Sequence, residues 1–318
     1  MKNAPISNLS VKRISSSPYF SSTFTQLESE TIGRLTNAEM LPFNSSKLAS
    51  VLITNTHTEL SSISTDQLAA CRLMIHPNSG YDNFSREFIA NAKFPIVIGN
   101  PIRANAVANF ILSALFSHYE VIPTEIAWNP SRKWPRKILS ELNILILGHG
   151  HIGSLLKNSL TPLAQEVRIY DPYAGFTNLD LNNIDVLIPT CSLNKKNTHF
   201  IDKNFLLKLN EDFLLINAAR GSLIHTQNLL DVLKNRPEAY AVLDVFEKEP
   251  CNFENIYNEA KNISLTSHIA GVYKNIDAAT AHFEASVIFD FINLENSLFE
   301  NKYKNLLLKN RLFHQDLI

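Results

Sequence analysis

Three of the nine glycines in this chain fall within six residues, at Gly148, Gly150 and Gly153. The sequence GHGHIG follows the apolar run NILIL (143–147) directly and precedes a segment with helical periodicity. Glycines between a strand and a helix permit a tight turn, close approach of a phosphate group, and close packing of the helix on the strand. The pattern predicts a dinucleotide site at the N-terminus of that helix. The alternative is a glycine turn that only caps the helix.

Short apolar runs alternate with helical segments through the second half of the chain. This alternation is typical of a parallel sheet covered by helices on both faces, and it predicts an α/β fold with a doubly wound parallel sheet. The runs SVLIT (50–54) and RLMIH (72–76) indicate a second, smaller α/β unit. Helical periodicity at 105–119 and 277–294 predicts long helices where the chain would pass between the units. The strand-like runs of the second half are NILIL (143–147), VRIY (167–170), DVLI (185–188), FLLI (213–216), AVLDV (241–245) and ISLT (263–266).

The composition of the chain bears on which kind of binding partner is expected. The 318 residues include 29 basic and 30 acidic side chains, for a net charge of -1, so no positive field favours nucleic acid or anionic lipid. The three cysteines are far apart and show no CxxC spacing, which favours reduced thiols and offers no metal site. No apolar segment has the length of a membrane span. We therefore expect a cytoplasmic protein that acts on a small molecule.

A carboxylate follows the glycine turn at the spacing of a ribose ligand. Asp171 ends the run VRIY, about 20 residues beyond the first glycine. An aspartate there accepts a hydrogen bond from a ribose 2′-hydroxyl and repels a 2′-phosphate, so the sequence predicts NAD rather than NADP. His149 and His151 are expected near phosphate or solvent, because a metal would need a third ligand. The predicted cofactor contacts of this region are Gly148, Gly150, His151, Ile152, Gly153 and Asp171.

Three segments at the ends of expected strands carry groups suited to acid–base chemistry. INAARGSLI contains Arg220, VLDVFEKEP contains Glu249, and LTSHIAG contains His268. Ligands bind at the carboxyl edge of an open α/β sheet, so we expect these side chains at one rim. An arginine can bind a carboxylate through two hydrogen bonds, and a histidine can exchange a proton near neutral pH. Each has a structural alternative: a strand-end cap for Arg220, a buried core histidine for His268, and a solvated turn residue for Glu249.

In order and spacing, LILGHGHIG, YDPY, INAARGSLI, VLDVFEKEP and SHIAG resemble the D-isomer-specific 2-hydroxyacid dehydrogenases. That family includes lactate, glycerate, hydroxypyruvate and phosphoglycerate enzymes. The resemblance extends from about Val51 to Phe291 and includes NSGYDN (78–83) and NAVANF (105–110). It implies hydride transfer between NAD(H) and a 2-hydroxy or 2-oxo acid.

The same resemblance implies how the chain is divided. A Rossmann NAD-binding domain would span residues 101–289. A smaller, flavodoxin-like substrate-binding domain would comprise residues 1–100 and 290–318, with the substrate bound between the two domains. The resemblance further implies a homodimer, with residues 122–137 as a candidate arm.

Roles for individual side chains also follow from the resemblance. Arg220 would bind the carboxylate and carbonyl of the substrate, Glu249 would pair with His268, and His268 would be the acid and base. The loop before GYDN would supply backbone N–H groups to the substrate carboxylate. Substrate contacts are thus implied for Asn78, Ser79, Gly80 and Arg220, and contacts near the nicotinamide for Ala218 and Asp244.

Departures from the family pattern bear on the substrate. His76 and Pro77 stand where many relatives have a basic residue, Asn109 stands where a glutamate is common, and Ser267 stands where a proline is common. The loop TNTHTELS (54–61) lacks the arginines typical of phosphoglycerate enzymes, so we expect a small, non-phosphorylated D-2-hydroxy acid or 2-oxo acid. Two alternatives remain: an NAD-sensing, corepressor-like protein of the same fold, and a methyltransferase, in which the three catalytic candidates would have no task.

Overall fold

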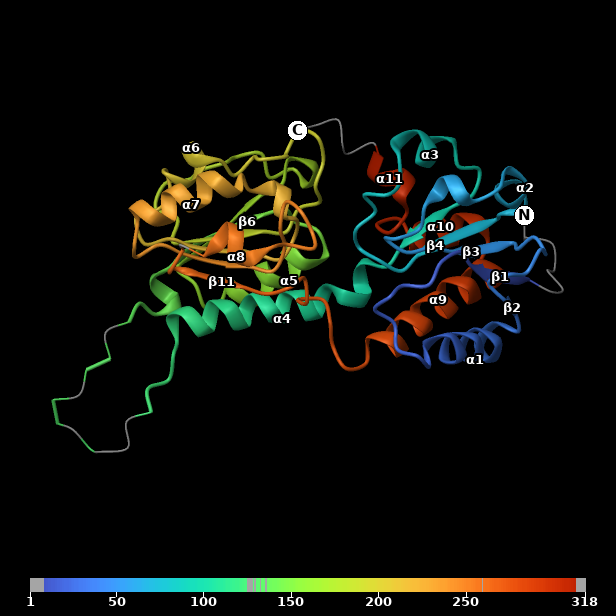
Figure 1. Cartoon of the computed structure of the whole chain (residues 1–318), viewed down its shortest axis with the longest axis horizontal. Coiled ribbons are helices and arrows are strands. Elements are labelled where there is room, and N and C mark those ends of the chain that lie inside the picture. The colour runs from blue at the N-terminus through green and yellow to red at the C-terminus, as the bar shows by residue number, and fades with distance from the viewer. Residues whose placement is uncertain are drawn as a thin grey trace. The chain divides into compact units, whose positions relative to one another are not determined.

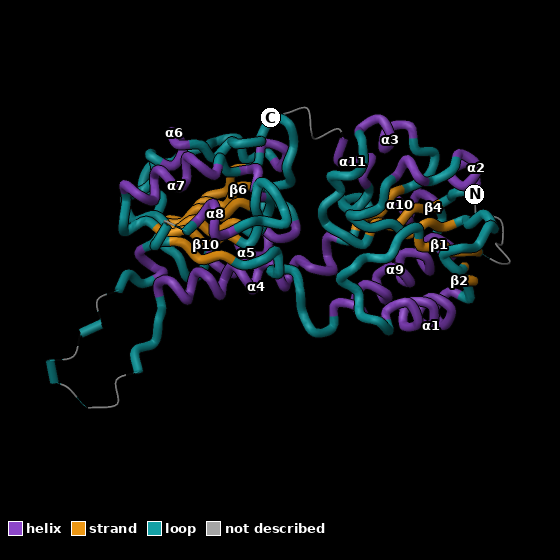
Figure 2. Tube along the Cα trace, viewed as in Figure 1, coloured by secondary structure: helices purple, strands orange, loops and turns teal. Residues whose placement is uncertain are grey.

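The computed structural model describes residues 9–124, 128, 130–131, 133–134, 136–258 and 260–312. The chain folds into two compact units, each with its own parallel sheet (Figure 1, Figure 2). Unit 1 runs to Arg103 and resumes at Tyr273, and unit 2 spans Ala104–Val272. The expected α/β class with two parallel sheets is confirmed.

The sheet of unit 1 has the strand order β2-β1-β3-β4-β5, and all neighbouring strands are parallel. This is the flavodoxin-like order, in which the chain direction across the sheet reverses between β1 and β3. The carboxyl ends of β1 and β3 therefore flank the point of this sheet where ligands are expected to bind. The strands are β1 (Ser10–Arg13), β2 (Glu39–Leu41), β3 (Val51–Ile53), β4 (Leu73–His76) and β5 (Ile96–Ile98).

Two helices of unit 1, α1 and α9, lie side by side although they come from opposite ends of the chain (Figure 1). Arg13 joins both of them to the sheet, because its guanidinium contacts Glu28 at 2.7 Å and Glu284 at 2.5 Å, and all three side chains are buried. The helical segments of unit 1 are α1 (Phe24–Thr36), η1 (Leu60–Ser62), α2 (Thr65–Ala70), α3 (Arg86–Asn91), α9 (Ile276–Asn293), α10 (Asn296–Lys302) and α11 (Leu308–Leu312).

The sheet of unit 2 has the parallel order β11-β10-β9-β8-β6-β7, with its reversal between β6 and β8. The strands are β6 (Asn143–Leu147), β7 (Glu166–Tyr170), β8 (Val186–Pro189), β9 (Leu214–Asn217), β10 (Tyr240–Leu243) and β11 (Ile263–Leu265). The helical segments are α4 (Asn100–Tyr119), which begins in unit 1, η2 (Leu139–Glu141), α5 (His151–Leu160), η3 (Pro172–Ala174), α6 (Lys203–Leu206), η4 (Gly221–Leu223), α7 (Thr226–Asn235) and α8 (Phe253–Tyr257).

Helices cover both faces of this second sheet (Figure 2). Along β6, Ile144 and Ile146 pack in a core with residues of α4 and α5, whereas Leu145 and Leu147 pack in a core with residues of α7. Successive side chains of a strand point to opposite faces, so a strand buried on both sides has a continuous apolar sequence. This explains why the strand pattern NILIL shows no polar alternation.

The structure departs from the expected organisation at one boundary. The chain leaves unit 2 at Tyr273, not near residue 290, because α9 packs on α1 and contributes Ala285 and Ile288 to the core of unit 1. The strands β1, β2 and β5 were not expected from sequence. In the part of the chain that the structure describes, no helix combines the length and apolar character needed to cross a membrane.

The segment expected to form an arm, residues 122–137, includes positions outside the described residues. At its described C-terminal end, Lys137 donates to Asp212 at 2.5 Å and to Asp185 at 3.3 Å. Arg136 forms an ion pair with Glu120. These contacts fix the end of the segment to unit 2.

Candidate active site

The glycine turn joins β6 to α5, and its shape depends on two of the glycines. Gly148 has a φ of 106°, which side chains disfavour, and a Cβ there would lie 2.8 Å from the backbone nitrogen of Cys191. A Cβ on Gly153 would lie 2.1 Å from the carbonyl oxygen of Gly148. By contrast, a Cβ on Gly150 would meet nothing within 4 Å. The turn is therefore closed on the protein side and open above Gly150.

Asp171 follows β7 and lies against this turn. One carboxylate oxygen accepts a hydrogen bond from the backbone N–H of His149 at 2.6 Å. The other accepts from the backbone N–H groups of Tyr173 and Ala174 at 3.1 and 3.2 Å. These three bonds hold the carboxylate beside the glycine turn, at the position where the sequence predicts a ribose ligand.

The residues present fit a dinucleotide. The open space above Gly150 and the N-terminus of α5, which starts at His151 and Ile152, suit a pyrophosphate, since the first N–H groups of a helix have no acceptor within the helix. The fixed carboxylate of Asp171 suits a ribose with two free hydroxyls. The other cofactor contacts expected from the sequence remain predictions.

Arg220 lies in the turn after β9. The fully buried Asn217 shapes this turn: its side chain donates to the Arg220 carbonyl at 3.0 Å and accepts from the Ala219 N–H at 3.0 Å. Gly221 is required next, because a Cβ there would lie 1.9 Å from the carbonyl carbon of Phe246. The turn after β9 is thereby pressed against the segment that follows β10. Ala218, which was expected near the nicotinamide, is partly buried against the core.

Glu249 and His268 form a hydrogen-bonded pair. His268 Nδ1 lies 2.7 Å from Glu249 Oε2, and Glu249 Oε1 accepts the backbone N–H of Phe246 at 3.0 Å. Burial alone would raise the pKa of Glu249, but its hydrogen bonds to His268 and Phe246, with the charges of His268 and Arg220, lower that pKa below its ordinary value. Glu249 is therefore a carboxylate at neutral pH.

Asp244 organises the loop that carries His268. Its buried carboxylate accepts hydrogen bonds from Thr266 Oγ1 at 2.6 Å and from the backbone N–H groups of Ile269 and Ala270 at 2.8 and 2.9 Å. The N–H of His268 donates to the Asp244 carbonyl at 2.8 Å, and His268 has a φ of 56°. A non-glycine residue in that conformation requires a surrounding structure that enforces it. The structure thus gives Asp244 a positioning role, and its expected contact near the nicotinamide remains a prediction.

Glu247, two residues before Glu249, belongs to a different pair. Its carboxylate contacts His199 Nε2 at 2.8 Å and accepts the backbone N–H of Thr226, at the start of α7, at 2.7 Å. Of the two glutamates in FEKEP, only Glu249 contacts His268. The pair of His199 and Glu247 was not expected from the sequence.

The residues expected to bind the substrate carboxylate, Asn78, Ser79 and Gly80, lie in unit 1, in the loop after β4. His76, Gly99 and Arg103 hold this loop through hydrogen bonds to its carbonyl groups, and sequence reasoning gave none of the three a function. The sequence could have indicated a role for His76, because this histidine ends the strand LMIH directly before the loop.

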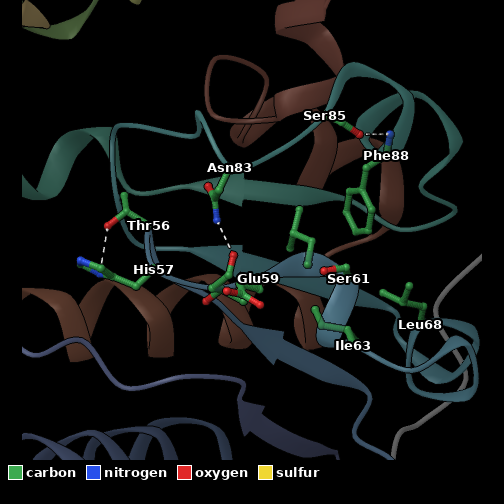
Figure 3. Close-up of a pocket in the computed structure, with 11 residues that line it drawn as sticks. Thr56, His57, Glu59, Ser61, Ile63, Leu68, Asn83, Ser85 and Phe88 are labelled. Atoms are coloured by element: carbon green, nitrogen blue, oxygen red, sulfur yellow. Dashed lines mark hydrogen bonds between the residues drawn. The ribbon is translucent and has the colours of Figure 1, made fainter. Parts of the chain in front are cut away.

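Unit 1 also contains a pocket of about 620 Å³ (Figure 3). It lies between the segment after β3 and the start of α3, and the side chain of Asn83 connects the two sides by donating to the carbonyls of Asn55 and Thr58 at 3.1 and 3.0 Å. Its lining includes Glu59 and no lysine or arginine. The residues that line it are Thr56, His57, Thr58, Glu59, Leu60, Ser61, Ile63, Leu68, Asn83, Ser85 and Phe88.

Several known proteins resemble this chain in sequence. It is 29% identical over 169 residues to a hydroxypyruvate reductase of Blautia hydrogenotrophica, covering 48% of this chain and 52% of that protein. It is 31% identical over 206 residues to an erythronate-4-phosphate dehydrogenase of Pseudoalteromonas atlantica, covering 61% of this chain and 51% of that protein. The match thus spans about half the length of these two relatives.

Among solved structures, the NAD⁺-bound 3-phosphoglycerate dehydrogenase of Entamoeba histolytica superposes with a TM-score of 0.65 at 17% identity, covering 91% of this chain and 98% of that one. This similarity concerns the fold. Residues 116–270 match the family model of the D-isomer specific 2-hydroxyacid dehydrogenase, NAD binding domain, which confirms NAD as the cofactor expected from the glycine turn. In its NAD-binding domain, its sequence relatives and its fold, the chain thus resembles the D-isomer specific 2-hydroxyacid dehydrogenases.

Proposed function

We propose that this protein is an NAD-dependent dehydrogenase that interconverts a small D-2-hydroxy acid and the corresponding 2-oxo acid. The observation that carries the proposal is the pair of His268 and Glu249 at 2.7 Å, with the charge of Arg220 acting on the same glutamate. This set combines a proton donor, a carboxylate that orients it, and a cation, which are the groups that reduction of a 2-oxo acid requires.

The proton is assigned to one nitrogen of His268. A carboxylate only accepts hydrogen bonds, so the nitrogen facing Glu249, Nδ1, carries a hydrogen. Nε2 is then the atom that gives a proton to the developing alkoxide during reduction and takes it back during oxidation. NADH, when bound, supplies the hydride that reaches the carbonyl carbon. The hydride and the proton together convert C=O to CH–OH.

Arg220 is proposed to bind the carboxylate of the substrate and to polarise its carbonyl oxygen. A guanidinium presents planar, paired donors that match a carboxylate, and its positive charge stabilises negative charge that develops on the adjacent oxygen. The backbone N–H groups of Asn78, Ser79 and Gly80 are proposed to bind the same carboxylate.

The proposed substrate carries no phosphate group. Residues 54–61 contain no lysine or arginine, and the pocket that this segment lines contains Glu59. A phosphate entering that pocket would meet the like charge of Glu59 and no lysine or arginine. The curated relatives act on both classes, hydroxypyruvate in one case and erythronate 4-phosphate in the other, so the choice depends on residues of this chain.

The test is a panel of 2-oxo acids assayed with NADH and with NADPH by nicotinamide absorbance. Pyruvate, glyoxylate, hydroxypyruvate and a branched 2-oxo acid are compared with phosphohydroxypyruvate. His268→Ala should lower kcat by roughly 10² to 10⁴-fold while NADH binding persists. The matched control is His199→Ala, which removes the other histidine that is paired with a glutamate in unit 2 and should leave kcat within about 3-fold.

Three outcomes would contradict the proposal. NADH binding without turnover of any acid would favour an NAD-sensing protein of the same fold. Normal turnover in His268→Ala would remove the proposed proton donor. A preference for the phosphorylated acid would overturn the proposed substrate class and leave the proposed reaction intact.

We also propose a homodimer. Its support is the exposure of apolar side chains in the segment expected to form an arm, where Ile122 is 79% and Trp128 is 84% exposed. Contact with a second copy would remove these side chains from water. Sedimentation or light scattering should give twice the chain mass of 35.8 kDa. A mass of one chain at micromolar concentration would contradict it.

A further inference from the structure

The loop Pro77–Gly80 after β4 is held to the protein through its carbonyl groups. The N–H of Gly99 donates to the carbonyls of His76 and Asn78 at 2.8 and 3.1 Å, and Arg103 Nη1 donates to the carbonyl of Pro77 at 3.0 Å. A Cβ on Gly99 would lie 2.5 Å from the carbonyl carbon of Pro77, so the loop is packed directly on the backbone after β5. Three successive carbonyls are thereby bound.

The imidazole of His76 binds a fourth carbonyl of this segment, that of Gly80. His76 Nε2 lies 2.7 Å from the carbonyl oxygen of Gly80, and Nδ1 lies 2.9 Å from Thr54 Oγ1. The ring is fully buried and meets Phe84 edge to face, with a centroid distance of 5.0 Å. His76 therefore connects β4 to the segment after β3, through Thr54, and to Gly80, the last residue of the loop.

These partners select one tautomer. A carbonyl oxygen only accepts, so Nε2 carries the hydrogen, and the hydroxyl of Thr54 then donates to Nδ1. Burial lowers the pKa of His76 to about 4, opposed by the hydrogen bond to Gly80, so the ring is neutral at pH 7. Both ring nitrogens are occupied, and the ring thus has no nitrogen left to exchange a proton with a substrate.

The N–H groups of the same loop contrast with its carbonyls. Among the residues that the structure describes, the backbone N–H groups of Asn78, Ser79 and Gly80 have no hydrogen-bond acceptor. Adjacent backbone N–H groups of this kind are suited to binding an anion. The hydrogen bonds to the carbonyls therefore fix the orientation of the loop's peptide planes. The backbone groups that they leave without a partner at Asn78, Ser79 and Gly80 are N–H donors.

We propose that His76 is a positioning residue for the 2-oxo acid, acting through its hydrogen bond to the Gly80 carbonyl to hold the N–H groups of Asn78, Ser79 and Gly80 ready for the substrate carboxylate. The inference rests on the proposed function of this loop. It adds the residue that maintains the loop's shape: the ring acts as a neutral donor to the backbone, and the anion is bound by N–H groups.

Two substitutions separate the hydrogen bond from the volume of the ring. His76→Phe fills the same space but has no donor, which leaves the Gly80 carbonyl without its partner. His76→Gln retains an amide N–H donor at nearly the reach of Nε2. His282→Phe is the matched control, because that histidine is exposed on α9 in the same unit.

The expected result is a split between KM and kcat. His76→Phe should raise KM for the preferred 2-oxo acid by at least about 10-fold, in the range that an unpaired buried acceptor produces, with kcat within about 3-fold of wild type. His76→Gln should restore KM to within about 3-fold, and His282→Phe should match wild type. The dissociation constant of NADH, measured by fluorescence, should be unchanged in all three, because the cofactor-binding residues lie in unit 2.

The opposing results are distinct. An unchanged KM in His76→Phe overturns the inference, and so does a parallel loss of kcat, KM and Tm that His76→Gln does not rescue, since that describes a purely structural residue. Direct titration of the protein–NADH complex with the 2-oxo acid separates this inference from the proposed function. Binding without turnover in the wild type would contradict only the proposed enzymatic activity, and the same variants would then be compared by their dissociation constants for the 2-oxo acid. Absence of binding to any 2-oxo acid would contradict both the proposed function and the role of His76.

Discussion

His268 Nδ1 lies 2.7 Å from Glu249 Oε2, and this contact joins two loops that follow different strands of unit 2. Glu249 comes from the segment after β10, and His268 comes from the turn after β11, where its backbone has a φ of 56°. Asp244 stabilises that backbone conformation by accepting hydrogen bonds from the backbone N–H groups of Ile269 and Ala270. The orientation of the imidazole is thus set by two carboxylates, one bound to the ring and one bound to the loop.

The first prediction concerns the charge of Glu249. Glu249→Gln keeps an acceptor near Nδ1 but removes the negative charge that stabilises a protonated imidazole, so kcat should fall by about 10 to 100-fold with little change in NADH affinity. Steady-state assays with the preferred 2-oxo acid measure this. Glu247→Gln is the matched control and should retain kcat within about 3-fold, because Glu247 contacts His199 and not His268. Equal losses in the two variants would contradict the assignment.

The second prediction concerns the choice between NAD and NADP. Asp171→Asn removes the negative charge beside the ribose position while keeping a side chain of the same size, so the ratio of kcat/KM for NADPH to that for NADH should rise by at least about 10-fold. The control is Asp180→Asn, which changes a partly exposed aspartate paired with Arg168. An unchanged cofactor ratio in Asp171→Asn would show that the ribose carboxylate lies elsewhere.

The third prediction concerns the two buried glutamates around Arg13. Burial raises the pKa of Glu284 well above its ordinary value, the neighbouring Glu28 adds to this, and Arg13 opposes it. Because the folded-state pKa is raised, the stabilisation is complete below the unfolded pKa of about 4.5 and is lost as the pH rises through the folded value. Glu284→Gln retains an acceptor for Arg13 and cannot lose a proton.

Glu284→Gln should therefore raise Tm by about 2–4 °C at pH 8 and have little effect near pH 4.5, as measured by calorimetry. Glu28→Gln is the contrasting variant. Glu28 binds Arg13 through both carboxylate oxygens, at 2.7 to 3.1 Å, so its neutralisation should lower Tm at both pH values. A destabilising Glu284→Gln at pH 8 would mean that this carboxyl is ionised in the folded protein.

Local pattern predicted much of unit 2. The strand NILIL, the glycines after it and the aspartate at the end of VRIY each depend on short-range rules of strand, turn and helix N-terminus, and the structure contains each where it was expected. The strand β1 escaped prediction because its sequence, SVKR, reads as polar. Arg13 is buried there only because Glu28 and Glu284, 15 and 271 residues away, surround its guanidinium.

By itself, the sequence determined the glycine turn, the strand-end positions of Arg220, Glu249 and His268, and hence the resemblance to a family and the cofactor. The resemblance also implied the pair of Glu249 and His268. Tertiary structure alone decided that Glu247 contacts His199, that α9 belongs to unit 1, and that His76 binds the Gly80 carbonyl. The physical reason is the range of the interactions. Turn and strand preferences arise from neighbouring residues, whereas these pairings depend on side chains that only the packing of distant segments brings within hydrogen-bond distance.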